Sequence, residues 1–222
     1  MKTKFIIIVL LWTTTFFAQD SLTFDASIVV LYPNKTNSKN VPDSLKQTFK
    51  LTEEEKLNNK PDTFNKSSPN VKLIAVKESE FLNNIDYFGE YTLRLVTFLG
   101  YNLFENFNNM IAYPKYLKVS PSVSAMKKFA INEKTNWVIN IKNVSVTGKD
   151  NQFSGHISLC VYNLLQDTII LDKSYELNDI NHGSMFACKD HSINCVINDF
   201  IYQAGNEILN TMLADKKYWE RK

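Results

Sequence analysis

The chain has 222 residues, of which 44% are apolar and 22% are charged, with 25 basic and 23 acidic side chains. This composition suffices for one globular domain with a substantial core, and it lacks the strong basic bias typical of nucleic-acid-binding proteins. The six glycines are dispersed, so the sequence contains no glycine-rich loop of the kind that binds nucleotide phosphates.

The first eighteen residues have the pattern of a secretory signal peptide. Lys2 and Lys4 precede an apolar run over residues 5–12, and Ala18 suits the position before a cleavage site. The run is too short to span a bilayer, so residues 1–18 are predicted to be removed. Removal takes away two lysines and no acid, which leaves 23 basic and 23 acidic residues. The mature protein is expected in the periplasm or outside the cell, without stable membrane insertion and without nucleic-acid partners.

Residues 19–70 are predicted to contain one strand followed by a polar linker. Residues 24–32 are rich in β-branched and aromatic side chains and are expected to form an edge strand. Residues 33–70 are rich in Asn, Lys, Ser and Thr, which predicts a flexible linker or long loop with one short helix near residues 43–57.

Residues 71–214 are predicted to form an α+β domain, and residues 215–222 a basic tail. The domain begins with a strand at residues 71–76 and a helix at residues 86–111, whose many aromatic residues favour a core face over a ligand pocket. A short strand at residues 116–119 and a second, short helix follow.

An antiparallel meander and a closing helix complete the predicted domain. Apolar residues alternate from Trp137 to Ile141 and then slip by one position to Val144, which predicts a strand with a β-bulge. Residues 148–151 supply a hairpin turn, and two further strands follow. Apolar residues then recur with the helical period over residues 193–213. The predicted order is β-α-β-α-β-β-β-α, a largely antiparallel mixed sheet with helices packed mainly on one face.

Residues 136–213 resemble the N-terminal domain of TolB and its relatives, which include the soluble domain of the curli-secretion lipoprotein CsgG. The similarity lies in the bulged strand (WVINIKNVSVTG), two further strands (ISLCVYNLLQD and TIILDKSYE) and the closing helix, and the strand-helix-strand-helix run from Val71 is similar too. The resemblance implies a cell-envelope protein that engages other proteins and has no enzymatic activity. The β-propeller of TolB and the lipidation cysteine of CsgG have no counterpart in this sequence.

The sequence contains three cysteines, Cys160, Cys188 and Cys195. In an exported protein, the proximity of Cys188 and Cys195 before the last helix favours a disulfide between them. His182 and His191 lie in the same stretch, so the alternative is a zinc site made of these two histidines and the two thiols, although the spacing matches no standard zinc module. No other cofactor is expected.

The sequence shows no recognisable catalytic constellation. His156, Ser158 and Tyr162 are predicted to lie on the polar face of the second meander strand, and this face or an exposed strand edge is the predicted binding surface. Two alternatives stay open: a hydrolase that uses His156 or His182, and a metal-binding protein that uses the cysteine-bearing turn. The favoured hypothesis is an exported, non-enzymatic interaction or accessory module of the cell envelope, with other envelope proteins as partners.

Overall fold

The computed structural model describes residues 25–42, 87–103, 109–115, 122–214 and 219. Its strands are β1 (Asp25–Leu31), β2 (Lys35–Lys39), β3 (Asn109–Lys115), β4 (Trp137–Lys149), β5 (Gln152–Asn163) and β6 (Thr168–Asn178). Its helices are α5 (Gly89–Leu103), α6 (Val123–Glu133), α7 (Ile193–Phe200) and α8 (Asn206–Leu213), with a 3-10 turn η2 (Ser184–Phe186) and a π-helical segment η3 (Ile201–Gly205). Within these residues, no helix has both the length and the apolar character needed to cross a membrane.

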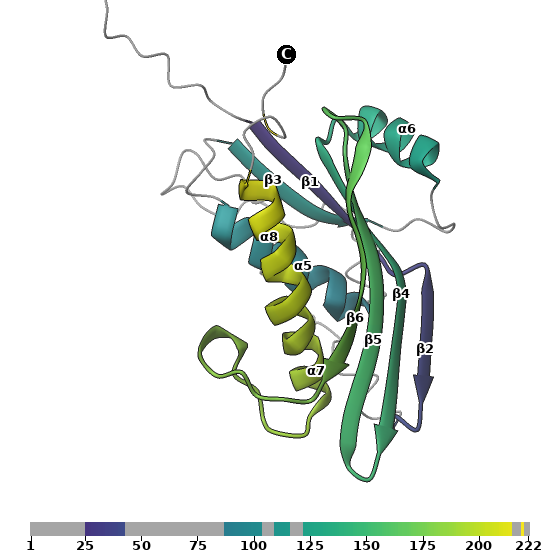
Figure 1. Cartoon of the computed structure of the whole chain (residues 1–222), viewed down its shortest axis with the longest axis vertical. Coiled ribbons are helices and arrows are strands. Elements are labelled where there is room, and N and C mark those ends of the chain that lie inside the picture. The colour runs from purple at the N-terminus through teal and green to yellow at the C-terminus, as the bar shows by residue number, and fades with distance from the viewer. Residues whose placement is uncertain (1–24, 43–86, 104–108, 116–121, 215–218, 220–222) are drawn as a thin grey trace, which may run out of the picture.

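The described strands form one mixed sheet with the order β3-β1-β4-β5-β6, and β2 pairs with β4 outside this path. Helices α5, α7 and α8 cover one face of the sheet, and α6 lies on the other face near one end (Figure 1). The predicted class, an α+β fold with a mixed sheet and helices mainly on one face, is confirmed.

Strand β1 is internal, which corrects the prediction of an edge strand. It pairs in parallel with both β3 and β4, and Ile28, Val29, Val30 and Leu31 are fully buried. A parallel strand that is covered on both faces carries apolar residues at every position, which explains this uninterrupted run. Alternate residues enter two separate apolar clusters, one on each face of the sheet.

Strand β2 lies within the stretch for which the sequence predicts a linker. Its sequence, KTNSK, pairs in parallel with residues 143–147 of β4 and contains no apolar residue. No hydrophobic pattern could therefore signal it. The rest of the predicted linker from residue 43, and the strand predicted at residues 71–76, lie outside the described residues.

Helix α5 ends at Leu103, which corrects the prediction of a helix up to residue 111. Residues 109–115 instead form β3, which pairs with β1 along its full length. The sequence FENFN before this strand contains two asparagines, and Asn109 begins the strand. Asparagine is a weak helix former, so pairing with β1 outweighs the helical periodicity. The strand predicted at residues 116–119 lies outside the described part of the chain.

The predicted meander and its bulge are confirmed. Strands β4, β5 and β6 pair in antiparallel order, and the register of β4 with β5 shifts between Ile141 and Asn143, where the apolar alternation slips. At the hairpin, Asp150 and Asn151 have φ angles of 50° and 62°. Asp and Asn tolerate this left-handed conformation, so the turn residues suit the hairpin.

The larger apolar cluster fills the space between the sheet and helices α5, α7 and α8. Phe200 of α7 lies in it, fully buried, with its ring centroid 5.5 Å from that of Tyr91 on α5. Gly155 of β5 lets α7 approach closely, because a Cβ atom there would lie 3.0 Å from Val196 Cγ1. The predicted closing helix is thus present, with η3 inserted between its two halves.

Candidate functional site

A groove of about 680 Å³ lies beside helix α5, within the size range of typical ligand pockets. We call it the α5 groove. One wall is the outer side of α5, and the opposite wall is formed by η2, α7 and the start of η3. The lining residues are Glu90, Leu93, Arg94, Thr97, Phe98, Tyr101, Asn102, Met185, Phe186, Asn198 and Ile201.

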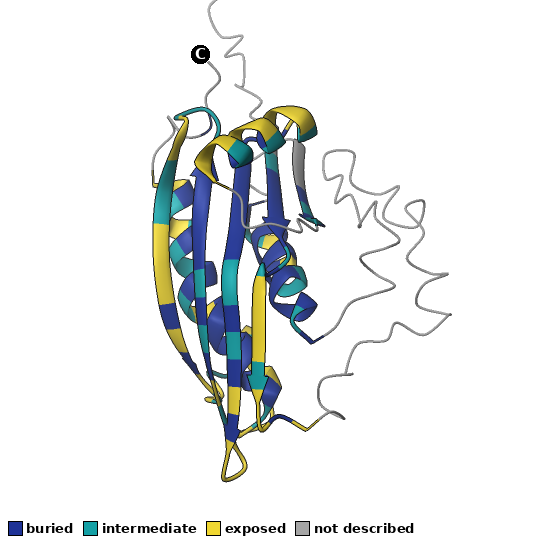
Figure 2. Cartoon of the chain, turned by 90° about the vertical axis from the view of Figure 1, so that its right-hand side faces the viewer, coloured by how far each residue is buried: buried dark blue, intermediate teal, exposed yellow. Residues whose placement is uncertain are grey.

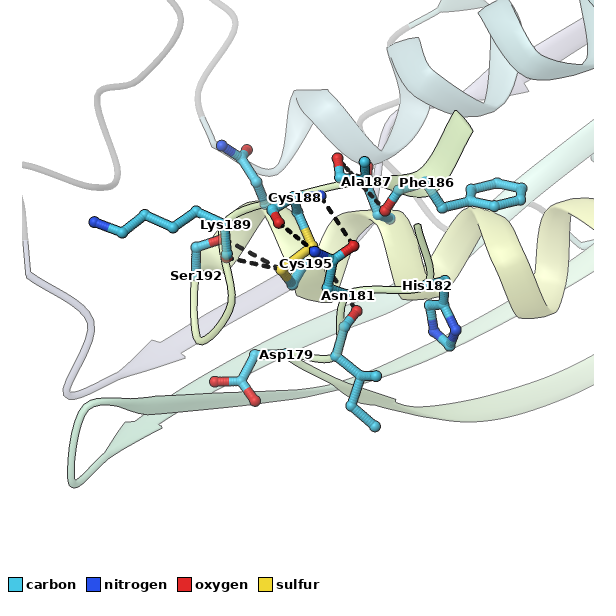
Figure 3. Close-up of a disulfide and its surroundings, with 12 residues drawn as sticks. Asp179, Asn181, His182, Phe186, Ala187, Cys188, Lys189, Ser192 and Cys195 are labelled. Carbon is cyan, nitrogen blue, oxygen red and sulfur yellow. Dashed lines mark hydrogen bonds between the residues drawn. A yellow bond between two sulfur atoms is a disulfide. The ribbon is translucent and has the colours of Figure 1, made fainter. Parts of the chain in front are cut away.

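The wall opposite α5 includes a loop, residues 179–192, that a disulfide fastens to the first turn of α7. Cys188 and Cys195 are joined with their Cα atoms 5.4 Å apart, so the predicted disulfide is present. Inside the loop, Asn181 donates from Nδ2 to the Cys188 carbonyl at 2.7 Å and accepts from Gly183 N–H at 2.9 Å (Figure 3). We call residues 179–192 the stapled loop. These cross-links stabilise the shape of the loop.

Asn198 of α7 connects the stapled loop to α5, the opposite wall of the groove. Its Nδ2 group donates to the carbonyls of Phe186 and Ala187 at 3.0 and 3.1 Å, and its Oδ1 atom accepts a hydrogen bond from Arg94 Nη1. The ring of Phe186 consequently packs 6.2 Å from Phe98 of α5, centroid to centroid. One buried amide thus fixes the position of the aromatic side chain across the groove.

The charged part of the described groove lining is an ion pair on α5. Glu90 is 5% exposed, and its Oε2 atom accepts from Nε of Arg94 at 3.0 Å. Burial raises the pKa of the Glu90 carboxyl, and the Arg94 guanidinium opposes that shift. The Arg94 side chain is 32% exposed, so a ligand in the groove can reach its guanidinium.

The π-helical segment η3 shapes the end of the groove. Such segments occur often at functional sites. Ile201 lines the groove, while Gly205 allows α5 close access, since a Cβ atom there would lie 3.2 Å from the Phe98 ring. Tyr202 stacks on His182 with ring centroids 3.9 Å apart, which connects η3 to the stapled loop.

His182 binds a buried carboxylate rather than a metal or a nucleophile. Its Nε2 atom lies 2.8 Å from Oδ1 of Asp199, and Oδ2 of Asp199 accepts from the backbone N–H of Asn178 and from Gln203. No hydroxyl or thiol is hydrogen-bonded to His182 among the described residues. The pair therefore fastens the stapled loop to α7 and β6.

The alternative zinc site is not assembled. Cys188 and Cys195 are consumed by the disulfide, and His182 is paired with Asp199. His191 lies instead on the exposed side of the loop, with its Nδ1 atom 3.5 Å from Asp179. Within the described part of the chain, no group of three or more His, Cys, Asp or Glu residues could hold a metal ion.

The predicted polar face of β5 is partly covered, because helix α6 lies across one end of this side of the sheet (Figure 2). Tyr162 is fully buried in the smaller cluster with Met126 and Ala130 of α6, which corrects its assignment to a binding face. His156 and Ser158 lie on the uncovered part, where His156 Nδ1 is 2.8 Å from Glu176 Oε1 and no hydroxyl or thiol is bonded to this histidine among the described residues. Their role in binding stays a prediction.

The groove could not be predicted from the sequence. Helical periodicity assigns the aromatic stripe that includes Phe98 to the core. Phe98 does belong to the core, but it also lines the groove, which the periodicity does not indicate. Arg94 and Asn198 are more than 100 positions apart in the chain, and nothing local to either residue indicates that they meet. A lone arginine beside an apolar stripe is the only signal that the sequence offers.

A scan against protein-family models found no match, and neither did a search of curated proteins. Among solved structures, the chain is similar to a neuraminyllactose-binding hemagglutinin homolog from Helicobacter pylori, with 17% identity, coverage of 87% of this chain and 85% of that chain, and a TM-score of 0.33. It is also similar to a hypothetical protein from Chlamydia trachomatis (10% identity, 86% and 99% coverage, TM-score 0.34) and to the LpoB C-terminal domain from Salmonella enterica (13%, 71% and 86%, 0.22). All three TM-scores lie below 0.5, so these similarities assign neither fold nor function to this chain.

Proposed function

We propose that this protein is an exported, non-enzymatic interaction or accessory module of the cell envelope, and that the α5 groove is its binding site. The observation that carries the proposal is the groove itself, a mostly apolar surface with one charged pair and with a wall fixed by a disulfide. Preorganised apolar surfaces with a few polar groups are typical of binding sites.

The rim of the groove supports an interaction role. Tyr101 and Met185 are 67% and 60% exposed, and both belong to residue types that are enriched in protein interfaces. Arg94, a third type with this preference, lies between the apolar side chains. The expected partners are other envelope proteins, in agreement with the resemblance to TolB and CsgG.

Export is supported by the N-terminal sequence pattern and by the disulfide, since disulfides persist mainly in oxidising compartments. Intact mass of the protein purified from an envelope fraction tests this part of the proposal. The expected mass corresponds to a chain that lacks residues 1–18 and is two hydrogens lighter than its reduced form. A chain that retains Met1, recovered only from the cytosol, contradicts export.

Affinity capture from the same envelope fraction tests the groove. Met185→Glu places a charge on the exposed rim and is expected to abolish capture of any partner without unfolding the domain. Ile131→Glu is the matched control, because Ile131 is 54% exposed on α6, on the other face of the sheet. Equal capture by both variants and the unsubstituted protein contradicts the groove as the binding site.

A further inference from the structure

We propose that the α5 groove binds the C-terminal end of a partner protein, with the terminal carboxylate on Arg94 and the last apolar side chains along Phe98 and Phe186. This inference rests on the proposed function and names the chemistry that the groove recognises. It follows from the donors of Arg94, from the position of Arg94 within the groove and from the length of the apolar part.

Arg94 has donors to spare for a carboxylate. A guanidinium carries five N–H groups. Nε donates to Glu90, Nη1 to Asn198, and Nη2 to Asn194 at a long 3.4 Å, which leaves one N–H on each terminal nitrogen without a partner among the described residues. Because these three acceptors hold the guanidinium in place, its remaining N–H groups are preorganised to donate charge-assisted hydrogen bonds to a carboxylate.

Among the described residues, the groove lining extends from Arg94 mainly in one direction. Toward the start of α5, the last described lining residue is Glu90, one helical turn away, and its carboxylate disfavours a further acidic group there. Toward the end of α5, the lining continues through Thr97, Phe98 and Tyr101. An internal Asp or Glu would need space in the groove for the peptide backbone on both sides of its carboxylate. A C-terminal carboxylate needs space for the backbone on one side only, which fits this groove better.

The apolar part fits a short extended segment. Arg94 and Tyr101 are seven positions apart, or about 10 Å along a helix that rises about 1.5 Å per residue. An extended chain covers this length with about three residues at about 3.3 Å each. Phe98, Phe186 and Ile201 provide apolar contacts over this distance, and the flexible side chain of Met185 can adjust to different partners. We therefore expect the last three residues of the partner to be mainly apolar.

Fluorescence anisotropy with synthetic peptides tests the inference. The probes are fluorescein-labelled hexapeptides that end in three residues drawn from Leu, Val, Ile and Phe, each made as the free acid and as the C-terminal amide. At least one free acid should bind saturably, and its amide should bind at least about tenfold more weakly, because it loses charge-assisted hydrogen bonds. Absence of binding across the set, or equal binding of acids and amides, overturns the inference.

Two variants and a competitor distinguish a protein terminus on Arg94 from a lipid and from unspecific attraction to positive charge. Arg94→Gln should remove the preference for the acid, whereas Lys127→Gln, which removes an exposed cation of α6, should keep it. If Arg94→Gln fails to fold, the comparison of acid and amide on the unsubstituted protein still decides. Decanoate that binds more tightly than every peptide would overturn the assignment to a protein terminus in favour of a lipid. Capture that depends on Met185, together with equal binding of acids and amides, would refute this inference and leave the proposed function standing.

Discussion

At the scale of single residues, Arg94 and Asn198 do most to build the groove. Asn198 connects Arg94 of α5 to the carbonyls of the stapled loop, so that the distant helix α5 and the adjacent loop share one buried amide. Arg94 in turn is the cation that opposes the burial of Glu90. Loss of a buried hydrogen-bonded group costs more than the net value of the bond, since its partner is left unsatisfied.

Arg94→Met should make stability more sensitive to pH. Burial already raises the folded-state pKa of Glu90 above its unfolded value, so the folded state takes up a proton more readily, and stability falls as pH rises through the folded pKa. Removal of the opposing cation raises this pKa further. Urea unfolding should show a loss of about 1 to 3 kcal/mol at pH 8 and a smaller loss at pH 5, where Glu90 is more readily protonated.

Lys127→Met is the control for this measurement, because the pair of Lys127 with Asp167 is about half exposed. Its substitution should change stability by less than about 1 kcal/mol at pH 8. An equal loss at both pH values for Arg94→Met would contradict the role assigned to Glu90.

At the scale of elements, the stapled loop and η3 convert an ordinary helix-on-sheet packing into a groove. The stapled loop carries Phe186 across to α5, and η3 adds Ile201 at the end of α7. Helix side chains also protect the outer edge of β6, where Gln203 donates to the Glu176 carbonyl at 2.9 Å and Asp199 accepts from Asn178 N–H. Such capping limits uncontrolled pairing at this end of an edge strand.

Replacement of Cys188 and Cys195 by alanine should lower the free energy of unfolding by about 2 to 3 kcal/mol in the chain-entropy model for a short closed loop. Chemical denaturation measures this loss. Reductant added to the unsubstituted protein should reproduce it, and reductant should have no further effect on the double variant. No difference between the oxidised and reduced protein would contradict a stabilising role for the disulfide.

The parts of the fold that could be predicted from the sequence are those with local periodicity. The alternation around Ile141 indicates the bulge, the helical period indicates the closing helix, and the proximity of Cys188 and Cys195 indicates the disulfide. Strand β2 could not be predicted, because it has no apolar residue and forms only by pairing with β4. The predicted end of α5 is wrong for a similar reason, since long-range pairing of β3 with β1 decides it.

Local periodicity could not predict the groove, because the groove depends on contacts between α5 and segments that are distant from it in the sequence. Tyr162 illustrates the same limit: its predicted place on the face with His156 and Ser158 is correct, but the cover supplied by α6 could not be derived from strand alternation. Burial of a strand face depends on which element packs over it, and the residue pattern of the strand does not indicate that element.

At the scale of the whole molecule, the two faces of the sheet are covered to different extents. The face beneath α5, α7 and α8 holds the larger core and, at its margin, the α5 groove. The opposite face carries α6 over a smaller cluster and is otherwise polar around His156 and Ser158. In the proposed mature form the charges balance, so recognition should depend on the local chemistry of the groove rather than on long-range attraction.

Photo-crosslinking in the living source organism tests most directly whether the α5 groove is the binding site. A photoreactive phenylalanine analogue replaces Thr97, an exposed residue of the groove lining, and in a control replaces Lys128, an exposed residue of α6. The groove position should give a reproducible adduct of protein size that the α6 position does not give, and Met185→Glu should remove it. The same adducts from both positions, or none from Thr97, would contradict the groove as the site of interaction.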